Sequence, residues 1–307
     1  MSKPLLINIV GPTASGKTAT AVALARQLKT EILSADSRQI YREMRIGTAV
    51  PSEEELAAVP HHFIGFKSIF DRFTAYDFEQ VALEKIRELS GKYPLLIMTG
   101  GTGLYFKAVT EGLDDLPDVA PEVRTKLRKE WEAGGIDKLL EELKRKDPGF
   151  YAEADIRNPR RVLRALEIIR TTGKPFSYFR SGRKKTRFFD TVWFGLTMDR
   201  ERLYDRINRR TDRMMASGLL KEAEKLYPHR YLPALQTVGY RELFEYFDGK
   251  TDLEKAVEEI KKNTRRYAKR QLTWFRKNKE IVWLDASLTT EKLIAEILSR
   301  LEGDRHQ

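Results

Sequence analysis

One short motif near the start of the chain limits its fold more than any other feature. Gly11-Pro-Thr-Ala-Ser-Gly16-Lys17-Thr18 matches the P-loop pattern G-x-x-x-x-G-K-[ST], between an apolar run and a helical pattern. The glycines let backbone N–H groups converge on phosphate oxygens, and the helix N-terminus adds positive potential. We therefore predict that a phosphate chain is bound by Gly11, Pro12, Thr13, Ala14, Ser15, Gly16, Lys17 and Thr18, with the Thr18 hydroxyl as a ligand of Mg²⁺.

Apolar runs and helical patterns alternate around this motif. Strands are expected at Leu5–Val10, Glu31–Ala35, His62–Phe66, Leu95–Met98, Thr191–Thr197 and Ile281–Leu284. Such alternation is typical of an α/β sheet with helices on both faces. From Pro121 to Gly182 the pattern is helical only. We predict a P-loop NTPase-like parallel α/β core, formed by residues 1–112 and 191–307, with an inserted all-helical domain at 113–190.

The positive charge of the chain is concentrated in two segments. The net charge is +11. Residues 157–187 contain eleven Lys and Arg against a single acid, Glu167, and residues 261–279 contain nine and no acid. Since the rest of the chain is net acidic, two such segments favour a polyanionic partner, namely nucleic acid, over two solvated helix faces.

Composition excludes several classes of protein. The chain has no cysteine, which rules out disulfides, thiol catalysis and cysteine-based zinc fingers. No run reaches the roughly 18 apolar residues of a membrane helix. The first apolar stretch leads into Gly11-Pro12, unlike a signal peptide. We expect a cytoplasmic protein with no membrane partner.

The ends of two predicted strands carry further chemistry. Leu95–Met98 is followed by Thr-Gly-Gly-Thr-Gly, without the acid that holds Mg²⁺ in many nucleotide-hydrolysing P-loop enzymes. This favours small-molecule group transfer over a motor or switch. Asp36 follows the second strand and should lie beside the P-loop. The spacing Asp36-x-x-Gln39 also fits a capping box in which Gln39 reaches back, and from spacing alone the cap is favoured.

Nine short segments occur in an order that characterises one enzyme family. Besides the P-loop they are Asp36–Tyr41, Ile46–Thr48, His61-His62, Thr99–Tyr105, Ala165–Glu167, Met215–Gly218, Val238–Arg241 and Lys269–Phe275. In this set the chain resembles the tRNA dimethylallyltransferases, from near its start to about residue 280. Arg45, Val50 and Gly65 depart from the family pattern, which has an acid, a lysine and an acid there, so no role is carried over to these positions.

The resemblance implies a reaction and a set of roles. A dimethylallyl group would pass from its diphosphate, held by the P-loop with Mg²⁺, to N6 of the tRNA adenosine adjacent to the anticodon on its 3′ side. Asp36 would accept the N6 proton, Thr102 would hydrogen-bond at the reacting centre, and Arg210 would neutralise the leaving diphosphate. Contacts to tRNA would come from Asp36, Ser37, Arg38, Gln39, Thr102, Arg124, Asn158, Pro159, Arg160, Arg161 and Arg164. The enzyme is expected to be a monomer.

General chemistry agrees with these roles. An adenine amine is a weak nucleophile, so the charge of the leaving diphosphate needs strong stabilisation. The base must also leave its stack to reach a buried site. Asn158-Pro159 predicts a helix start and Gly173 its end; Arg157, Arg160, Arg161 and Arg164 share one face of that helix. For this face, RNA contact is favoured over an internal carboxylate partner. Tyr267 and Trp274 are expected in the core.

Three other functions stay open at this point. The first is an isopentenyltransferase for free adenine nucleotides, for which the basic segment 157–187 would have little use. The second is a P-loop small-molecule kinase, which ATP consumption would reveal. The third is an RNA-binding protein with a vestigial P-loop, which any turnover of dimethylallyl diphosphate would exclude.

Overall fold

The computed structural model of the protein describes residues 3–303 and forms two compact units. Within that range the first unit comprises residues 3–110 and 186–303, and the second Glu111–Lys185. The sequence placed the insertion at 113–190. The return to the first unit comes earlier because Phe189 is buried in its core and Arg187 forms an ion pair with the buried Glu79. No helix in the described range is both long and apolar enough to cross a membrane.

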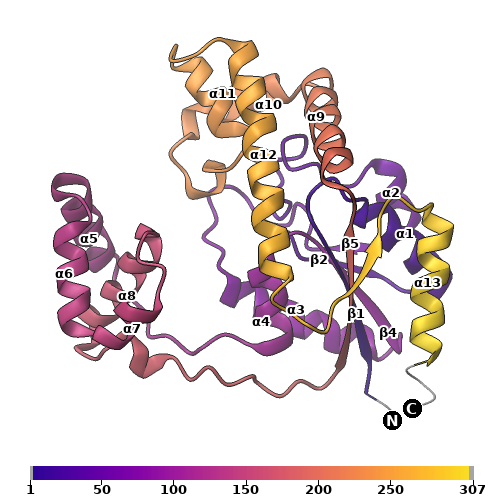
Figure 1. The fold of residues 1–307 in the computed structure, drawn as a ribbon, viewed down its shortest axis with the longest axis horizontal. Helices are drawn as coiled ribbons and strands as arrows, with labels where there is room; N and C mark the ends of the chain where they lie inside the picture. The colour runs from indigo at the N-terminus through magenta and orange to yellow at the C-terminus, as the bar shows by residue number, and fades with distance from the viewer. Residues whose placement is uncertain (1–2, 304–307) are drawn as a thin grey trace. The chain divides into compact units, whose positions relative to one another are not determined.

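Six parallel strands form the sheet of the first unit, in the order β3-β2-β4-β1-β5-β6 (Figure 1). They are β1 Leu5–Val10, β2 Ile32–Ser34, β3 His61–His62, β4 Leu95–Thr99, β5 Asp190–Thr197 and β6 Val282–Asp285. The prediction of an α/β fold with a parallel sheet is confirmed. The predicted strand at His62–Phe66 is wrong in extent, because Phe63 and Gly65 take positive φ angles of 70° and 61°, which end the extended conformation.

Helices cover both faces of this sheet (Figure 1). Ile7 and Ile9 of β1 pack with α1 (Lys17–Leu28) and α13 (Thr290–Gly303). Leu6 and Val10 belong to a second core that contains residues of α3 (Ala75–Ser90) and α4 (Gly103–Glu111). Because successive strand residues point to opposite faces, a strand buried on both sides needs a nearly continuous apolar sequence. In β1 only Asn8 is polar, and its amide donates to the backbone carbonyls of Leu6 and Val192. This explains why Leu5–Val10 could be recognised as a strand from its sequence.

Five further helices of the first unit surround the ends of the strands. They are α2 Glu53–Ala58, α9 Arg200–Ala216, α10 Leu219–Leu226, α11 Tyr240–Phe247 and α12 Leu253–Phe275. Short 3₁₀ turns lie at Tyr227–His229 and Pro233–Leu235. Helices α9 and α12 pack through Leu203, Ile207 and Ala268. This apolar contact fixes α9, whose arginines contribute to the site described below.

The second unit is helical throughout its described residues. It contains α5 Pro121–Gly134, α6 Asp137–Lys146, α7 Pro148–Glu153, α8 Pro159–Thr172 and a 3₁₀ turn at Phe176–Phe179. Leu127, Leu143 and Leu166 are among its buried core residues. Helix α8 begins and ends where the sequence predicted, with Gly173 left-handed after it; Asn158 occupies the N-cap position, but its side chain makes no capping hydrogen bond.

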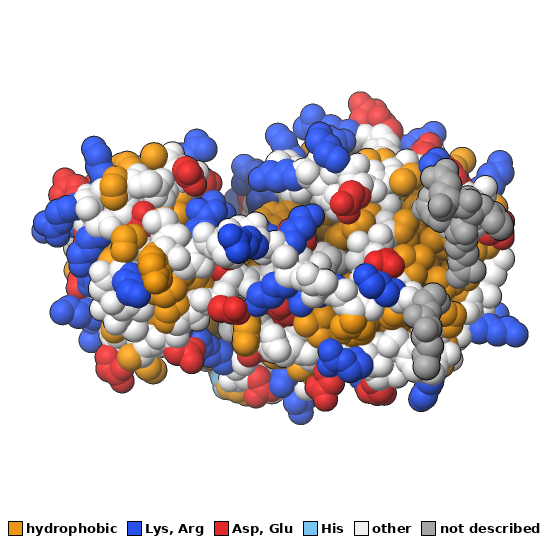
Figure 2. Space-filling view, turned by 90° about the horizontal axis from the view of Figure 1, so that it is seen from below, with side chains coloured by type: hydrophobic (Ala, Val, Ile, Leu, Met, Phe, Trp, Pro, Cys, Tyr) orange, Lys and Arg blue, Asp and Glu red, His pale blue; other side chains and the backbone are white. Residues whose placement is uncertain are grey.

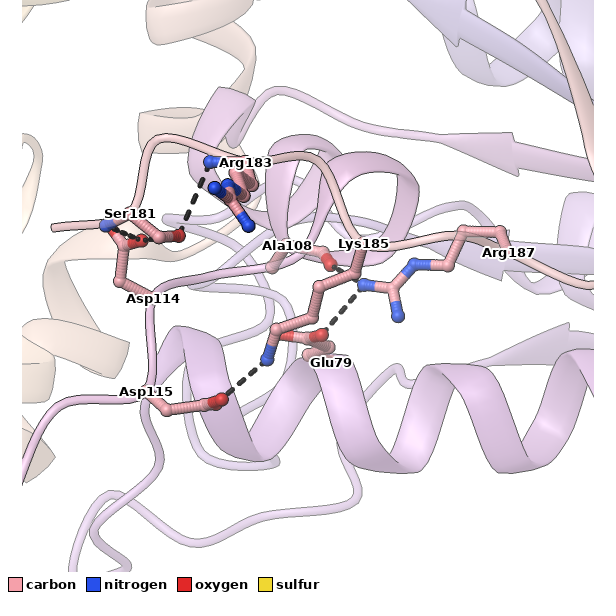
Figure 3. Close-up of polar contacts among 8 residues, drawn as sticks. All are labelled: Glu79, Ala108, Asp114, Asp115, Ser181, Arg183, Lys185 and Arg187. Carbon is pink, nitrogen blue, oxygen red and sulfur yellow. Dashed lines mark hydrogen bonds and ion pairs between the residues drawn. The ribbon is translucent and has the colours of Figure 1, made fainter. Parts of the chain in front are cut away.

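Polar contacts fix the segments near the two points where the chain passes between the units (Figure 3). Within the second unit, Asp114 accepts hydrogen bonds from the backbone N–H and the hydroxyl of Ser181, at 2.9 and 2.8 Å. The Lys185 ammonium pairs with Asp115 at 2.8 Å. Within the first unit, the Arg187 guanidinium donates to Glu79 and to the carbonyl of Ala108, both at 2.7 Å. Each side of the junction is therefore held by its own contacts.

Candidate active site

The P-loop connects β1 to α1 and has the backbone geometry that its glycines allow. Gly11 has φ +145°, and a Cβ there would lie 2.4 Å from the carbonyl oxygen of Leu196. Gly16 has φ +97° and precedes the first turn of α1. Both positions require glycine, the first for space and the second for conformation. The Lys17 ammonium folds back and donates to the Pro12 carbonyl at 2.6 Å.

Two groups around this loop lack a polar partner among the residues that the structure describes. The Ser15 hydroxyl is buried and makes no hydrogen bond there. Arg210 is half-buried and forms no ion pair with any described residue. Burial lowers the pKa of Lys17 to about 7, with Arg210 adding repulsion. Burial also lowers the pKa of Arg210, an effect that Asp36 opposes and Arg213 reinforces. Buried donors and mutually repelling cations fit a bound polyanion.

Two arginines of α9 join this cationic group, and the sequence analysis did not identify them. The Arg206 guanidinium lies 3.5 Å from the position that a Cβ on Gly16 would take, so it lies over the P-loop. Arg206 and Arg213 also line an open pocket together with Arg209 and Asp212. The signal was present in the sequence, because Arg206, Arg210 and Arg213 follow helical spacing along one face of α9.

A Mg²⁺ ion at this site would have the Thr18 hydroxyl as its protein ligand. No group of three or more histidine or carboxylate side chains in the described range could hold a metal. Mg²⁺ commonly takes only one or two protein ligands and completes its shell with phosphate oxygens and water. Thr18, in the first turn of α1, is partly exposed, and its hydroxyl makes no hydrogen bond to the described residues. The donor set therefore fits a metal carried with a bound diphosphate.

Asp36 lies just beyond β2, and one of its carboxylate oxygens is free to act. Oδ1 accepts hydrogen bonds from the backbone N–H groups of Arg38 and Gln39, at 2.9 and 3.4 Å. Oδ2 accepts none from the described part of the chain and lies 3.6 Å from the Cβ position of Gly101. Residues 37–40 form turns, so Asp36 does not cap a helix. One oxygen holds the loop while the other faces the site.

The capping-box interpretation of Gln39 is wrong. Its side-chain amide does not reach back to Asp36 but donates to the carbonyls of Ala49 and Thr48, at 2.9 and 3.3 Å, and accepts from the Ser34 hydroxyl at 3.2 Å. Gly65, with its positive φ, donates its N–H to the Gln39 carbonyl at 2.8 Å. Gln39 therefore joins the loop after Asp36 to the segment that follows Arg45.

That following segment is held by a glutamate that the sequence analysis also missed. Glu222 of α10 accepts hydrogen bonds from three successive backbone N–H groups, those of Arg45, Ile46 and Gly47, at 3.0, 2.9 and 2.9 Å. The Arg45 side chain is exposed, and Val50 donates its N–H to the Arg45 carbonyl. At Arg45 only the backbone takes part in this contact, so the loop does not depend on its side chain.

Thr102 lies next to Asp36 in space. Its Oγ1 accepts the Ser37 backbone N–H at 2.9 Å and donates to the Ser37 hydroxyl at 3.2 Å. Its own N–H donates to the carbonyl of Ala35 at 3.1 Å. The negative charge of Asp36 acts to raise the pKa of both Lys17 and Arg210, against the effect of burial. The structure thus brings together Lys17, Asp36, Thr102 and Arg210, which come from four separate segments of the first unit.

Two aromatic residues of α12 were expected in the core, and the structure corrects this for Trp274. The Trp274 side chain is 41% exposed and lies against Gly103, where a Cβ would be 2.1 Å from its ring. Tyr267 is half-buried, and burial together with the charge of Asp36 raises its pKa. Both rings therefore border the site, because α12 passes along its rim and turns this face toward Asp36 and Gly103.

Many basic side chains of the segment 157–187 form ion pairs, most of them with acids outside this segment. Arg170 pairs with Glu130 and Glu142 at 2.8 and 2.5 Å. In the second unit Glu167 pairs with Arg164 at 3.0 Å and with Arg124 at 3.6 Å. Arg160 and Arg161 are exposed, as is Asn158, and neither arginine forms an ion pair within residues 3–303; Pro159 is partly buried. The free charge of this segment is smaller than its composition suggests.

The second basic segment keeps most of its charge. Lys261 and Lys262 pair with acids, but the exposed side chains further along α12 and just after it form no ion pair with described residues: Arg266, Lys269, Arg270, Arg276 and Lys277. On the face drawn in Figure 2, basic side chains are interleaved with acidic and apolar ones. Exposed basic side chains without an ion pair in the described range therefore lie along the second half of α12 and just after it.

Comparison with known proteins places this site in context. The family model described as IPP transferase matches residues 39–278. A tRNA dimethylallyltransferase of Christiangramia forsetii is 54% identical over 96% of this chain and 98% of its own, and one of Flavobacterium psychrophilum is 49% identical over 97% and 99%. Among solved structures, a full-length tRNA isopentenylpyrophosphate transferase of Bacillus halodurans is 42% identical with a TM-score of 0.72, covering 98% and 96% of the two chains. A eukaryotic dimethylallyltransferase acting on tRNA is 27% identical with a TM-score of 0.78, covering 92% and 74%.

Proposed function

Since this chain belongs to the IPP transferase family, we propose that it transfers a dimethylallyl group from dimethylallyl diphosphate to N6 of the tRNA adenosine 3′-adjacent to the anticodon. One observation carries the proposal. The cations Lys17, Arg206 and Arg210, which lack carboxylate ion-pair partners among the described residues, gather at the same edge of the sheet as the free Oδ2 of Asp36. The three cations can stabilise the charge of a leaving diphosphate. The Asp36 carboxylate oxygen can accept the proton that the acceptor amine loses.

The cationic group would stabilise the leaving diphosphate. The C1–O bond of the allylic substrate breaks as the N6–C1 bond forms, and negative charge grows on the diphosphate oxygens. The backbone N–H groups of the P-loop, the Ser15 hydroxyl and the Lys17 ammonium would bind these oxygens, with Arg210 and Arg206 on the side of α9. Mg²⁺, held by Thr18, would supply further charge neutralisation when bound.

Asp36 would act as the general base. Its Oδ2 accepts the proton that N6 loses, while the two backbone hydrogen bonds to Oδ1 keep the carboxylate oriented. Thr102 and Ser37 would position the adenine from the adjoining loop. The Arg38 guanidinium donates to the carbonyls of Pro233 and Ala234, at 3.2 and 2.9 Å, which fixes the outer side of this pocket.

The surfaces for tRNA would lie on both units. In the second unit, Arg160 and Arg161 are the arginines of α8 that are free to meet phosphates, with Asn158 and Pro159 beside them. In the first, the exposed basic residues of α12 would serve the same purpose. A monomeric enzyme, acting in the cytoplasm where tRNA is modified, is part of the same proposal. The alternative of free adenine nucleotides as acceptors is not favoured, because the matched relatives are tRNA-modifying enzymes over nearly their whole length.

The proposal is tested by following the prenyl group. Purified protein, Mg²⁺ and labelled dimethylallyl diphosphate are incubated with an unmodified tRNA that carries adenosine after the anticodon. The same tRNA with guanosine at that position serves as the matched control. We expect label in the first tRNA only. Label in neither tRNA, with ATP consumed when a nucleoside is supplied, would instead support the kinase.

A further inference from the structure

Gln271 is a buried amide that joins two loops of the site. Its side chain is only 5% exposed. Its Oε1 accepts the backbone N–H of Thr13 at 2.8 Å, and its Nε2 donates to the carbonyl of Gly101 at 2.9 Å. An amide is one of the few side chains that can accept on one side and donate on the other. Both polar ends of this buried group are therefore used.

The two loops hold the two halves of the reaction. Thr13 belongs to the P-loop after β1, and Gly101 to the loop after β4, the strand paired with β1. The second loop is tied to Asp36 by the Thr102 N–H, which donates to Ala35, and by the Ser37 N–H, which donates to Thr102. Gln271 thus connects the loop for the diphosphate with the loops for the acceptor.

The helix that carries Gln271 is itself anchored. Ala268, one turn earlier on α12, is fully buried against Leu203 and Ile207 of α9. Helix α9 carries Arg206 and Arg210. The Gln271 amide is therefore held at a fixed position relative to Arg206 and Arg210. Through its two hydrogen bonds it also fixes the loops of Thr13 and Gly101 relative to these arginines.

The contact between Gln271 and the second loop requires a residue without a side chain at Gly101. A Cβ on Gly101 would lie 2.3 Å from the Gln271 Nε2, closer than side chains approach. Gly101 is not among the residues with positive φ, so its backbone does not itself demand glycine. The other neighbours of that Cβ position, including Asp36 Oδ2 at 3.6 Å, are at ordinary contact distance. An alanine here would displace the Gln271 amide and little else.

We propose that Gln271 is a positioning residue that sets the separation and orientation of the diphosphate loop relative to Asp36 and Thr102. This inference rests on the proposed function. Transfer requires N6, C1 and the leaving oxygen to lie nearly in line, and a displacement of about 1 Å can lower such a rate by about 100-fold. Gln271 touches neither reacting atom in this account and acts through the loops that do.

Two independent substitutions break the contact. Gln271→Met keeps the length of the side chain and removes both hydrogen bonds, whereas Gly101→Ala keeps Gln271 and pushes its amide away. Each should lower kcat for prenyl transfer by about 10–100-fold. Each should leave the Kd of inorganic diphosphate, measured without tRNA, within about threefold of wild type, since a positioning role affects alignment rather than binding. Gln80→Met and Gly134→Ala are matched controls, because Gln80 is exposed and a Cβ on Gly134 meets nothing within 4 Å.

The double variant separates positioning from general damage. If both changes remove the same contact, the Gly101→Ala/Gln271→Met protein should be no slower than the slower single variant. Wild-type kcat in Gln271→Met, additive losses in the double variant, or a loss seen mainly in diphosphate Kd would each overturn the proposal. A wild-type protein that prenylates no tRNA would overturn the proposed function as well, whereas active wild type with unaffected variants overturns only the role of Gln271.

Discussion

The Lys17 ammonium nitrogen lies 2.6 Å from the carbonyl oxygen of Pro12, within the same phosphate-binding loop. Burial and the nearby Arg210 lower the pKa of Lys17 to about 7, and the negative charge of Asp36 opposes this effect. Near pH 7 the Lys17 side chain of the free protein is therefore partly charged and partly neutral. A bound diphosphate would favour the charged form.

Diphosphate binding should accordingly take up a proton at Lys17. Near pH 6 the side chain is already charged and contributes little uptake, whereas at pH 8–9 its contribution should approach about one proton per diphosphate bound. Calorimetric titration in two buffers of different ionisation enthalpy measures this number. Lys17→Arg is the matched control, because a guanidinium is charged in both states. Equal uptake by the two proteins at pH 8 would show that Lys17 does not titrate there.

Asp36→Asn should separate catalysis from folding. Asparagine can still accept the N–H groups of Arg38 and Gln39, so the loop and the thermal midpoint should be kept. It cannot accept the N6 proton, so kcat and kcat/KM should both fall by about 10²–10⁴-fold. Steady-state prenyl transfer and thermal unfolding give the two values. A folded variant that turns over at nearly the wild-type rate would mean that another group is the base.

Arg210 should be required for activity and unfavourable for stability. Its guanidinium is half-buried beside Lys17, Arg206 and Arg213 with no ion pair in the described range, an arrangement that penalises the folded protein without ligand. Arg210→Met should raise the thermal midpoint of the free protein while lowering kcat by about 10²–10³-fold. Saturating diphosphate should reverse the order of stability. A lower midpoint in the free variant would indicate that Arg210 has a stabilising partner.

The arginines of α8 should differ in their contribution to tRNA binding. Arg160→Ala/Arg161→Ala should reduce the slope of log K against log salt by about 0.7–0.9 for each phosphate that the variant no longer neutralises. Arg164→Ala should change it less, because Arg164 already pairs with Glu167. Arg128→Ala, on the exposed face of α5 and paired with Glu132, is the control. Filter binding over a series of salt concentrations measures the slopes; equal slopes for all four proteins would remove α8 from the tRNA surface.

Local sequence patterns were sufficient for the sheet and for part of the site. The P-loop, Asp36 and the strands depend on residues close together in the chain, so spacing and apolar runs reveal them. Gln271 contacts Thr13, 258 residues away, and no periodicity reports such a pair. The same reason explains the overestimated charge of residues 157–187, since Arg170 is neutralised by Glu130 and Glu142, 40 and 28 residues distant. Only the fold shows which charges remain free.

The position and stoichiometry of the modified nucleoside test the central proposal most directly. After reaction with dimethylallyl diphosphate, the tRNA is cut into fragments, the prenylated nucleoside is located, and the released diphosphate is counted. We predict one dimethylallyl group on N6 of the adenosine that follows the anticodon and one diphosphate per group transferred, with the rate of both lowered by about 10²–10⁴-fold in Asp36→Asn. Diphosphate released without modified tRNA, or a prenyl group at another nucleoside, would contradict it.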